Sequence, residues 1–243
     1  MRVSRIYTES ALTENSLLEL NRETSHYLLK VLRLKAGDSM VLFNGDGYQF
    51  QCELVSTHSK TATVQVIERS EKEKPPVLKI HLGIGLSKGD RLDIAFQKAT
   101  ELGVTEITPL FTEHATLKLN EERLKKKILH WQGIIRSASG QSGRCYLPRL
   151  NQPCSVNKWI QEDFTGLKIV LSPNQSITMD QFCTPQNLTL LIGPEGGLSD
   201  AEVTAATQQG FKATRLGNHV LRTETAPLAA IAAAQALWGD FRN

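Results

Sequence analysis

The sequence predicts a small β-domain followed by an α/β domain with a parallel sheet, and two patterns carry this prediction. In the first third of the chain, apolar and polar residues alternate over 39–44, 48–56 and 61–68, as in strands with one buried face. The Gly-Asp-Gly sequence at 45–47 favours a tight hairpin, so these strands indicate a small antiparallel barrel or sandwich. From residue 77 onward, apolar segments alternate with helical patterns, which is typical of a parallel sheet covered by helices.

A charged segment, 68–76, separates the two patterns and ends in Pro75 and Pro76. Proline lacks the backbone N–H that a strand ladder requires, so regular structure is interrupted here. We therefore expect a first domain over 1–72 and a second over 77–243. The expected strands of the second domain are 77–86, 105–111, 167–172, 187–193 and 211–217, and its expected helices are 88–103, 120–139, 199–210 and 225–238.

Residues 190–202, LLIGPEGGLSDAE, begin as a buried strand, stop at glycines and continue into a helix. Ser199 and Glu202 have the spacing of a capping box, which places a helix start directly after the glycines. Ligands of open α/β sheets bind at the carboxyl ends of the strands, and glycines leave backbone groups accessible there. The turn is therefore a candidate binding loop, and a tight turn without a ligand is the alternative.

Two further loops are expected at the same edge of the sheet. Residues 225–238 carry no charge, which predicts a helix buried on all sides, and Arg222 and Glu224 stand at its start. An unpaired charge in that position would be costly, so these two side chains contact a ligand or, alternatively, pair with each other or cap the helix. A proline turn at 170–174 ends another strand. We expect the three loops to form one pocket.

The charge and the cysteine content of the chain indicate which partners and metal sites to expect. The net charge of +3 permits a nucleic-acid partner without requiring one, and the four cysteines form no C-x-x-C pair, so we expect no metal site. The first residues lack the apolar core of a signal peptide, and no apolar segment approaches the roughly 20 residues that span a bilayer. We therefore expect a cytoplasmic protein without a membrane partner.

Positive charge is concentrated in residues 115–150, which hold eight basic and two acidic residues. The basic residues are Lys118, Arg123, Lys125, Lys126, Lys127, Arg136, Arg144 and Arg149, against Glu121 and Glu122. The resulting local charge of +6 is twice that of the whole chain and favours contact with phosphates. A solvated, lysine-rich helix face is the alternative interpretation.

Four ordered segments resemble the bacterial ribosomal RNA small-subunit methyltransferase E family: 26–38, 97–113, 190–202 and 216–226. The resemblance implies a SPOUT-type parallel sheet with a C-terminal trefoil knot, preceded by a PUA-like β-barrel that holds RNA. It also implies a homodimer that uses S-adenosyl-L-methionine (SAM) to methylate N3 of a uridine in 16S ribosomal RNA of the small subunit.

The resemblance also implies roles for individual residues. The SAM site would comprise Leu171, Ser172, Leu191, Ile192, Gly193, Pro194, Glu195, Gly196, Leu216, Gly217, Val220 and Leu221. Arg222 and Arg144 would stabilise the uridine anion, and Glu224 would accept its proton, as hypotheses for the chemistry. The RNA contacts would be Arg2, Arg5, Lys30, Arg33, Lys88, Lys125 and Arg136.

The chain departs from the family pattern at two positions, with Gly140 in place of an acidic residue and His114 in place of an arginine. Three alternatives stay open. The chain could act on another ribosomal or transfer RNA position, or could be a non-catalytic RNA-binding assembly protein. A nucleotide-dependent oxidoreductase is disfavoured, because Gly83, Gly85 and Gly89 have the wrong spacing for a dinucleotide fingerprint.

Overall fold

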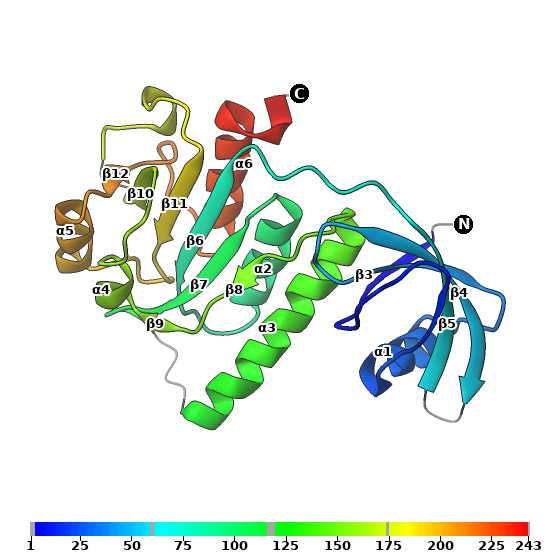
Figure 1. Ribbon diagram of the computed structural model, residues 1–243. Helices are drawn as coiled ribbons and strands as arrows, with labels where there is room; N and C mark the ends of the chain where they lie inside the picture. Colours follow the sequence, from blue (N-terminus) through cyan, green and yellow to red (C-terminus); the bar gives the residue numbers. More distant parts are fainter. Residues whose placement is uncertain (1–2, 59–60, 116–119, 174, 243) are drawn as a thin grey trace. The chain divides into compact units, whose positions relative to one another are not determined.

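The structure is a computed structural model that describes residues 3–58, 61–115, 120–173 and 175–242 (Figure 1). The chain divides into two compact units. Unit 1 comprises Met1–Pro75 and Arg136–Leu147, and unit 2 comprises Pro76–Ile135 and Pro148–Asn243. No helix within the described residues is long and apolar enough to cross a bilayer.

Unit 1 is built on a five-stranded sheet in the order β1-β3-β4-β5-β2. The strands are β1 (Ser4–Tyr7), β2 (Ser16–Glu19), β3 (Ser39–Phe43), β4 (Gln49–His58) and β5 (Thr61–Arg69), with the short helix α1 (Arg22–His26) after β2. Strands β3 and β4 pair antiparallel on either side of 45–47, which confirms the predicted hairpin. The predicted strands pair antiparallel throughout β3, β4 and β5, which confirms that expectation, and β1, which the sequence did not predict, pairs with β3 in parallel.

The sequence assigns residues 136–147 to the second domain, whereas they group with unit 1. The physical reason is close packing between the end of a long helix, α3 (Glu121–Ser142), and strand β1. A Cβ on Gly140 would lie 2.8 Å from the carbonyl oxygen of Arg5, so only glycine allows this approach. Arg136 lies over the ring of Tyr7, with its Cζ 4.9 Å from the ring centroid. Gly140 therefore has a packing role here.

We expect Gly140→Ala to lower the free energy of unfolding by about 2 kcal/mol, because the added methyl group would press on the backbone of β1. Gly133→Ala is the matched control on the same helix, since its Cβ would meet no atom within 4 Å. That control should gain about 0.5–1 kcal/mol from helix propensity. Urea unfolding of both variants measures the difference, and equal effects would contradict the packing role of Gly140.

Unit 2 is built on a parallel sheet in the order β12-β10-β11-β6-β7-β8, with β9 also paired to β7. Its strands are β6 (Lys79–Gly85), β7 (Glu106–Phe111), β8 (Arg149–Leu150), β9 (Cys154–Ser155), β10 (Leu167–Leu171), β11 (Asn187–Ile192) and β12 (Lys212–Thr214). Every strand pairing recorded in this sheet is parallel, which confirms the prediction. The carboxyl ends of β10, β11 and β12 therefore meet at one edge.

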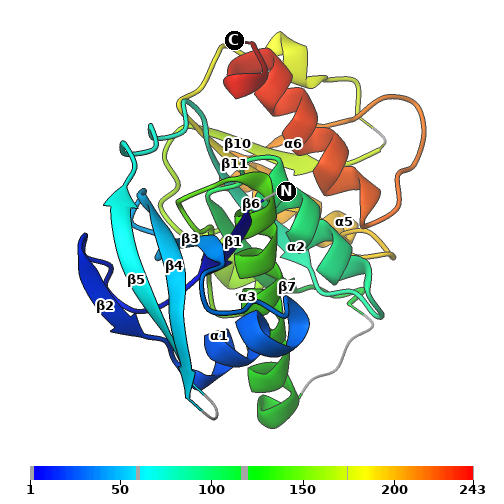
Figure 2. The same cartoon turned by 90° about the vertical axis from the view of Figure 1, so that its right-hand side faces the viewer.

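Helices cover both faces of this sheet, with α2 and α6 packed together on one face and α4 and α5 on the other (Figures 1 and 2). Their bounds are α2 (Arg91–Glu101), α4 (Val156–Trp159), α5 (Asp200–Gln208) and α6 (Thr225–Trp238). The prediction that α6 is buried on all sides is wrong. It buries the face of Pro227, Ile231 and Gln235, whereas Ala236 is exposed and the alanines beside it are half-buried.

Candidate functional site

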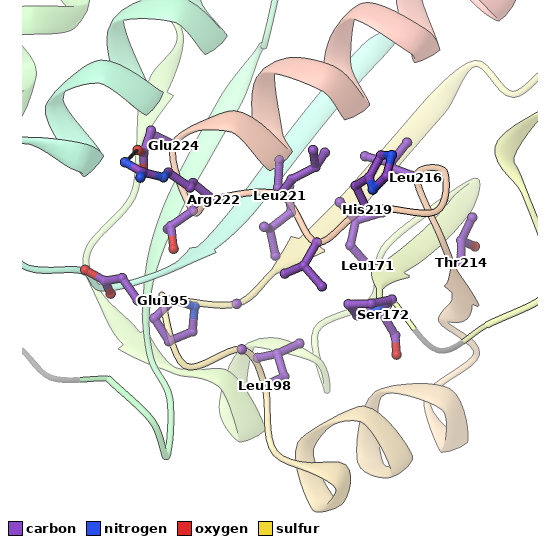
Figure 3. Close-up of a pocket in the computed structure, with 18 of the residues that line it drawn as sticks. Leu171, Ser172, Glu195, Leu198, Thr214, Leu216, His219, Leu221, Arg222 and Glu224 are labelled. Carbon is purple, nitrogen blue, oxygen red and sulfur yellow. Dashed lines mark ion pairs between the residues drawn. The ribbon is translucent and has the colours of Figure 1, made fainter.

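The loops that follow β10, β11 and β12 enclose a cavity of about 500 Å³ in unit 2 (Figure 3). The lining residues are Arg91, Leu171, Ser172, Pro173, Ile192, Gly193, Pro194, Glu195, Gly197, Leu198, Val203, Thr214, Leu216, Gly217, His219, Val220, Leu221, Arg222, Thr223, Glu224 and Ala226. The three loops meet there because their strands are neighbours and parallel. A cavity of this size is typical of small-molecule sites.

The glycine turn is held by close backbone packing. A Cβ on Gly193 would lie 2.7 Å from the backbone of Gly197 and Leu198, so the turn can close only on a glycine. A Cβ on Gly85, at the end of β6, would lie 2.5 Å from Pro194, so β6 supports the turn from below. These glycines shape the wall of the cavity.

Helix α5 begins with the predicted capping box. Ser199 Oγ accepts a hydrogen bond from the Glu202 N–H (3.2 Å), and Glu202 Oε2 accepts one from the Ser199 N–H (2.9 Å). The other carboxylate oxygen of Glu202 accepts from the Glu113 N–H (2.8 Å), which ties the loop after β7 to the turn. This buried carboxylate thereby fixes the entry of the helix relative to the glycine turn.

Ten of the twelve residues expected to bind the cofactor line the cavity. They are Leu171, Ser172, Ile192, Gly193, Pro194, Glu195, Leu216, Gly217, Val220 and Leu221. The other two lie outside the lining. The side chain of Leu191 is fully buried in the hydrophobic core beside Trp159, because adjacent residues of a strand face opposite sides. Gly196 faces His114, whose Nδ1 lies 3.1 Å from its carbonyl oxygen.

Acidic and basic side chains gather at one end of the cavity, and the other end is mixed, with leucines beside Ser172, Thr214 and His219 (Figure 3). Glu195, Arg222 and Glu224 gather at one end, whereas Leu171 and Leu216 lie toward the other (Figure 3). Arg222 Nη1 lies 4.0 Å from Glu224 Oε1, so the two predicted catalytic side chains form a long ion pair. Their exposure differs greatly, since the Arg222 side chain is 83% exposed and that of Glu224 is 19% exposed.

Arg91, which was not among the predicted site residues, joins two of the loops. Its Nη1 donates a hydrogen bond to Glu195, and its Nε lies 3.8 Å from Glu224 Oε2. Burial raises the pKa of Glu195, but hydrogen bonds from its own backbone, Ser87, Arg91 and the Lys88 N–H outweigh burial and hold that pKa below its usual value. A signal was present, since Arg91 follows β6 and so belongs to the same edge of the sheet.

Because the folded protein depresses the pKa of Glu195, this group stabilises the fold above its unfolded pKa of about 4.5 and loses that effect as pH falls. We expect Arg91→Met to remove part of the effect, so that stability drops less between pH 7 and pH 3. Lys98→Met is the control, because it breaks a surface ion pair with Glu101 on the same helix. Unfolding curves at several pH values test this, and equal pH slopes for Arg91→Met and wild type would contradict it.

Thr223 and His219 also line the cavity, and neither was among the predicted site residues. Both lie within the segment 216–226, so the motif itself was visible. The sequence of this segment does not show which of its side chains point into the cavity. Thr223 is 5% exposed, and its hydroxyl has no hydrogen-bond partner within the described residues.

The basic residues predicted to act on RNA belong to both units. Arg144, the third expected catalytic residue, lies in unit 1, where its carbonyl oxygen accepts a hydrogen bond from Arg5 (3.2 Å). Arg5 also donates to the carbonyl oxygen of Gly143 (2.9 Å), and Arg136 pairs with Glu9. Those two guanidinium groups are therefore engaged within unit 1.

The remaining basic candidates differ in exposure and position. Lys30 and Arg33 are exposed in unit 1, and Lys88 and Lys125 are exposed in unit 2. Arg2 and Lys118 lie outside the described residues. Within the basic segment, Lys126 forms an ion pair with Glu122 (2.7 Å), which supports a solvated helix face for that part.

Known families match both parts of the chain. The RNA methyltransferase domain family matches residues 73–235, and the RNA methyltransferase PUA domain family matches residues 20–67. The ribosomal RNA small subunit methyltransferase E of Buchnera aphidicola subsp. Schizaphis graminum is 36% identical, covering 99% of this chain and 98% of the relative. The protein of that name from Bacillus subtilis is 33% identical, covering 93% and 92%.

Solved structures agree with these relatives. A Legionella pneumophila protein, solved in complex with bound SAM, is 38% identical with a TM-score of 0.96 and covers 99% of this chain and 100% of its own. The ribosomal RNA small subunit methyltransferase E of Neisseria gonorrhoeae, bound to S-adenosyl methionine, is 33% identical with a TM-score of 0.92 and the same coverage. The resemblance inferred from four segments is thus confirmed, and the chain belongs to the ribosomal RNA small subunit methyltransferase E family.

Proposed function

We propose that the protein transfers the methyl group of SAM to N3 of a uridine in 16S ribosomal RNA of the small subunit. The observation that carries the proposal is the cavity at the carboxyl ends of β10, β11 and β12, in a chain of this methyltransferase family. Two solved relatives of the same fold bind SAM, which supports SAM as the cofactor.

The residues of the cavity fit this cofactor. Adenine needs apolar surfaces above and below its ring and backbone groups along its edge, and Leu171, Leu216 and the glycine turn supply them. The amino-acid part of SAM is charged, and the opposite end of the cavity carries Arg91, Glu195 and Glu224 (Figure 3). We infer that the nucleoside lies toward the end with Leu171 and Leu216 and the amino-acid part toward the end with Glu195 and Glu224.

When bound, SAM supplies an electrophilic methyl group, so the protein must position the base and manage its proton. Neutral uridine holds a proton on N3 and becomes a nucleophile only as this proton leaves. The exposed guanidinium of Arg222 can stabilise the anion that spreads over O2 and O4 of the base. Glu224 carries a carboxylate at the cavity wall and can accept the proton. Arg144 stays a prediction as a second cation.

RNA contacts are proposed for the exposed cations of both units. Lys30 and Arg33 follow an exposed tyrosine, Tyr27, within six residues of the chain in unit 1, and the match of this region to a PUA domain of RNA methyltransferases supports binding of RNA there. Lys88 and Lys125 of unit 2 add further positive charge. Arg5 and Arg136 are left out, because their side chains are engaged within unit 1.

We propose a homodimer as well. Helix α6 buries one face in unit 2 and leaves an uncharged face of alanines, Ala229, Ala232, Ala233 and Ala236, half-buried or exposed. A second copy packed on this face would remove it from water. Light scattering measures the mass of the species in solution.

The trefoil knot, the domain boundaries at 72 and 77 and a cytoplasmic location stay predictions of the family resemblance and the sequence.

The decisive experiment is transfer of labelled methyl groups from SAM to small ribosomal subunits that lack 3-methyluridine. We expect label in 16S ribosomal RNA, recovered as 3-methyluridine after digestion and mass spectrometry. Label in a different nucleoside would redirect the proposal to another RNA position. Binding of SAM without any transfer would favour the non-catalytic assembly protein.

A further inference from the structure

The two central residues of the glycine turn are held from different sides. The Gly197 N–H donates to the Pro194 carbonyl oxygen (2.9 Å), which makes Glu195 and Gly196 the centre of the turn. The side chain of Glu195 is held by Arg91, which follows β6. The carbonyl oxygen of Gly196 takes no part in the turn's own hydrogen bond, so a donor from another segment can hold it.

His114, in the loop that follows β7, supplies that donor. Its Nδ1 lies 3.1 Å from the Gly196 carbonyl oxygen, and a carbonyl oxygen only accepts, so the bond requires a proton on Nδ1. The two residues also touch, since a Cβ on Gly196 would lie 2.9 Å from the Cβ of His114. Glycine at position 196 therefore lets the histidine approach the backbone of the turn.

The same loop is anchored beside His114 by a buried carboxylate. The Glu113 N–H donates to Oε1 of Glu202 (2.8 Å), whose Oε2 accepts from the Ser199 N–H where α5 begins. Glu202 is 5% exposed, whereas His114 and Gly196 are both exposed. The anchor fixes the backbone of the loop, and the histidine extends this hold to the centre of the turn. An exposed hydrogen bond adds little to global stability, but it can bias the local opening of a turn.

We propose that His114 is a positioning residue, which holds the glycine turn in the conformation that binds SAM. This inference rests on the proposed function. Pro194 and Glu195 of the turn line the cavity, whereas His114 is not among the lining residues, so the histidine acts on SAM through the turn. A turn that is ordered before binding loses less conformational freedom when the cofactor binds, which raises the affinity.

His114→Ala tests the proposal through two readouts. One hydrogen bond at an exposed site shifts the open–closed equilibrium of the turn by up to about fivefold, so we expect the Kd for SAM to rise about threefold. In the ligand-free protein, the Gly197 amide should exchange its hydrogen about twofold faster, because its bond to Pro194 closes the turn. Isothermal titration calorimetry gives the Kd, and NMR gives the exchange. The Tm should stay that of wild type.

Two further variants at the same position separate the hydrogen bond from the bulk of the side chain. His114→Asn places an amide nitrogen as many bonds from Cα as Nδ1 and should restore both the Kd and the exchange rate. His114→Leu retains an apolar bulk without a donor and should behave like His114→Ala. Equal values for the asparagine and leucine variants would overturn the proposal.

His130→Ala is the matched control. His130 is another exposed histidine of unit 2, and its Nε2 pairs with Asp93 (2.7 Å) away from the residues that line the cavity. This variant should leave the Kd for SAM and the exchange of the Gly197 amide unchanged, so a loss equal to that of His114→Ala would overturn the proposal.

A direct contact of His114 with RNA makes a different prediction. In that case His114→Ala would raise the KM for small subunits, while the Kd for SAM and the exchange of the Gly197 amide would stay those of wild type. That result would overturn the proposal. Failure of the wild type to bind SAM would instead overturn the proposed function, and the exchange in the ligand-free protein would still show whether His114 holds the turn. The two failures are therefore distinguishable.

Discussion

Arg222→Ala is expected to lower kcat for methyl transfer by about 10²–10³, the range found when a group that stabilises transition-state charge is removed. The side chain is 83% exposed, so the fold should not depend on it. Its nearest ion-pair partner, Glu224 Oε1, is 4.0 Å away, which leaves the guanidinium able to contact a substrate. The Kd for SAM should change by no more than about twofold, because a contact made only in the transition state affects kcat and leaves ground-state binding in place.

Initial rates of label transfer to small subunits, together with calorimetry for SAM, separate these two quantities. Lys212→Ala is a matched control, since it removes another exposed cation of unit 2 outside the cavity and should retain full activity. Arg222→Lys retains the charge and should recover part of the rate. A loss of less than tenfold in Arg222→Ala would remove Arg222 from the proposed chemistry.

Gly193→Ala is expected to weaken SAM binding by at least about a hundredfold and to lower the free energy of unfolding by about 2–3 kcal/mol. The new methyl group would lie 2.7 Å from backbone atoms of Gly197 and Leu198, and a backbone cannot yield as a flexible side chain does. The turn would have to open, which would displace the wall formed by Pro194 and Glu195.

Gly89→Ala is the matched control for that prediction. Gly89 also lies in a loop at the carboxyl end of a strand, and a Cβ there would meet no atom within 4 Å. Its φ of +70° makes alanine strained, so we expect a cost of about 1–2 kcal/mol in stability with little change in SAM affinity. If both variants lost the same amount of SAM affinity, general destabilisation would explain the loss. Close packing at Gly193 would then not be its cause.

Patterns of local physical chemistry made much of the fold predictable. Alternation of apolar residues and the Gly-Asp-Gly turn predicted the β3–β4 hairpin, and continuous apolar segments predicted a parallel sheet. The capping box at Ser199 and Glu202 predicted the start of α5. Each of these signals depends on residues that are close in sequence, so it can be recognised without the tertiary structure.

The candidate site was predictable where it follows the ends of strands. Parallel strands bring their carboxyl ends to one edge, so the loops at 171–173, 192–198 and 214–224 could be assigned to one pocket before the structure. The side chain of Leu191 lies in the hydrophobic core because neighbours in a strand face opposite sides, and the sequence does not say which side meets the cavity; its role in cofactor binding stays a prediction. Arg91 was missed for a related reason, since its partners Glu195 and Glu224 are more than a hundred residues away.

The sequence by itself determined the two folding patterns, the helix starts and the family of this protein, because motifs and periodicities are local. Tertiary structure alone decided that residues 136–147 pack with unit 1, since that depends on Gly140 meeting the backbone of Arg5. It also decided that α6 buries one face and that Arg91 meets Glu195 and Glu224. Burial and hydrogen bonding depend on which distant segments meet, and a linear pattern does not contain that information.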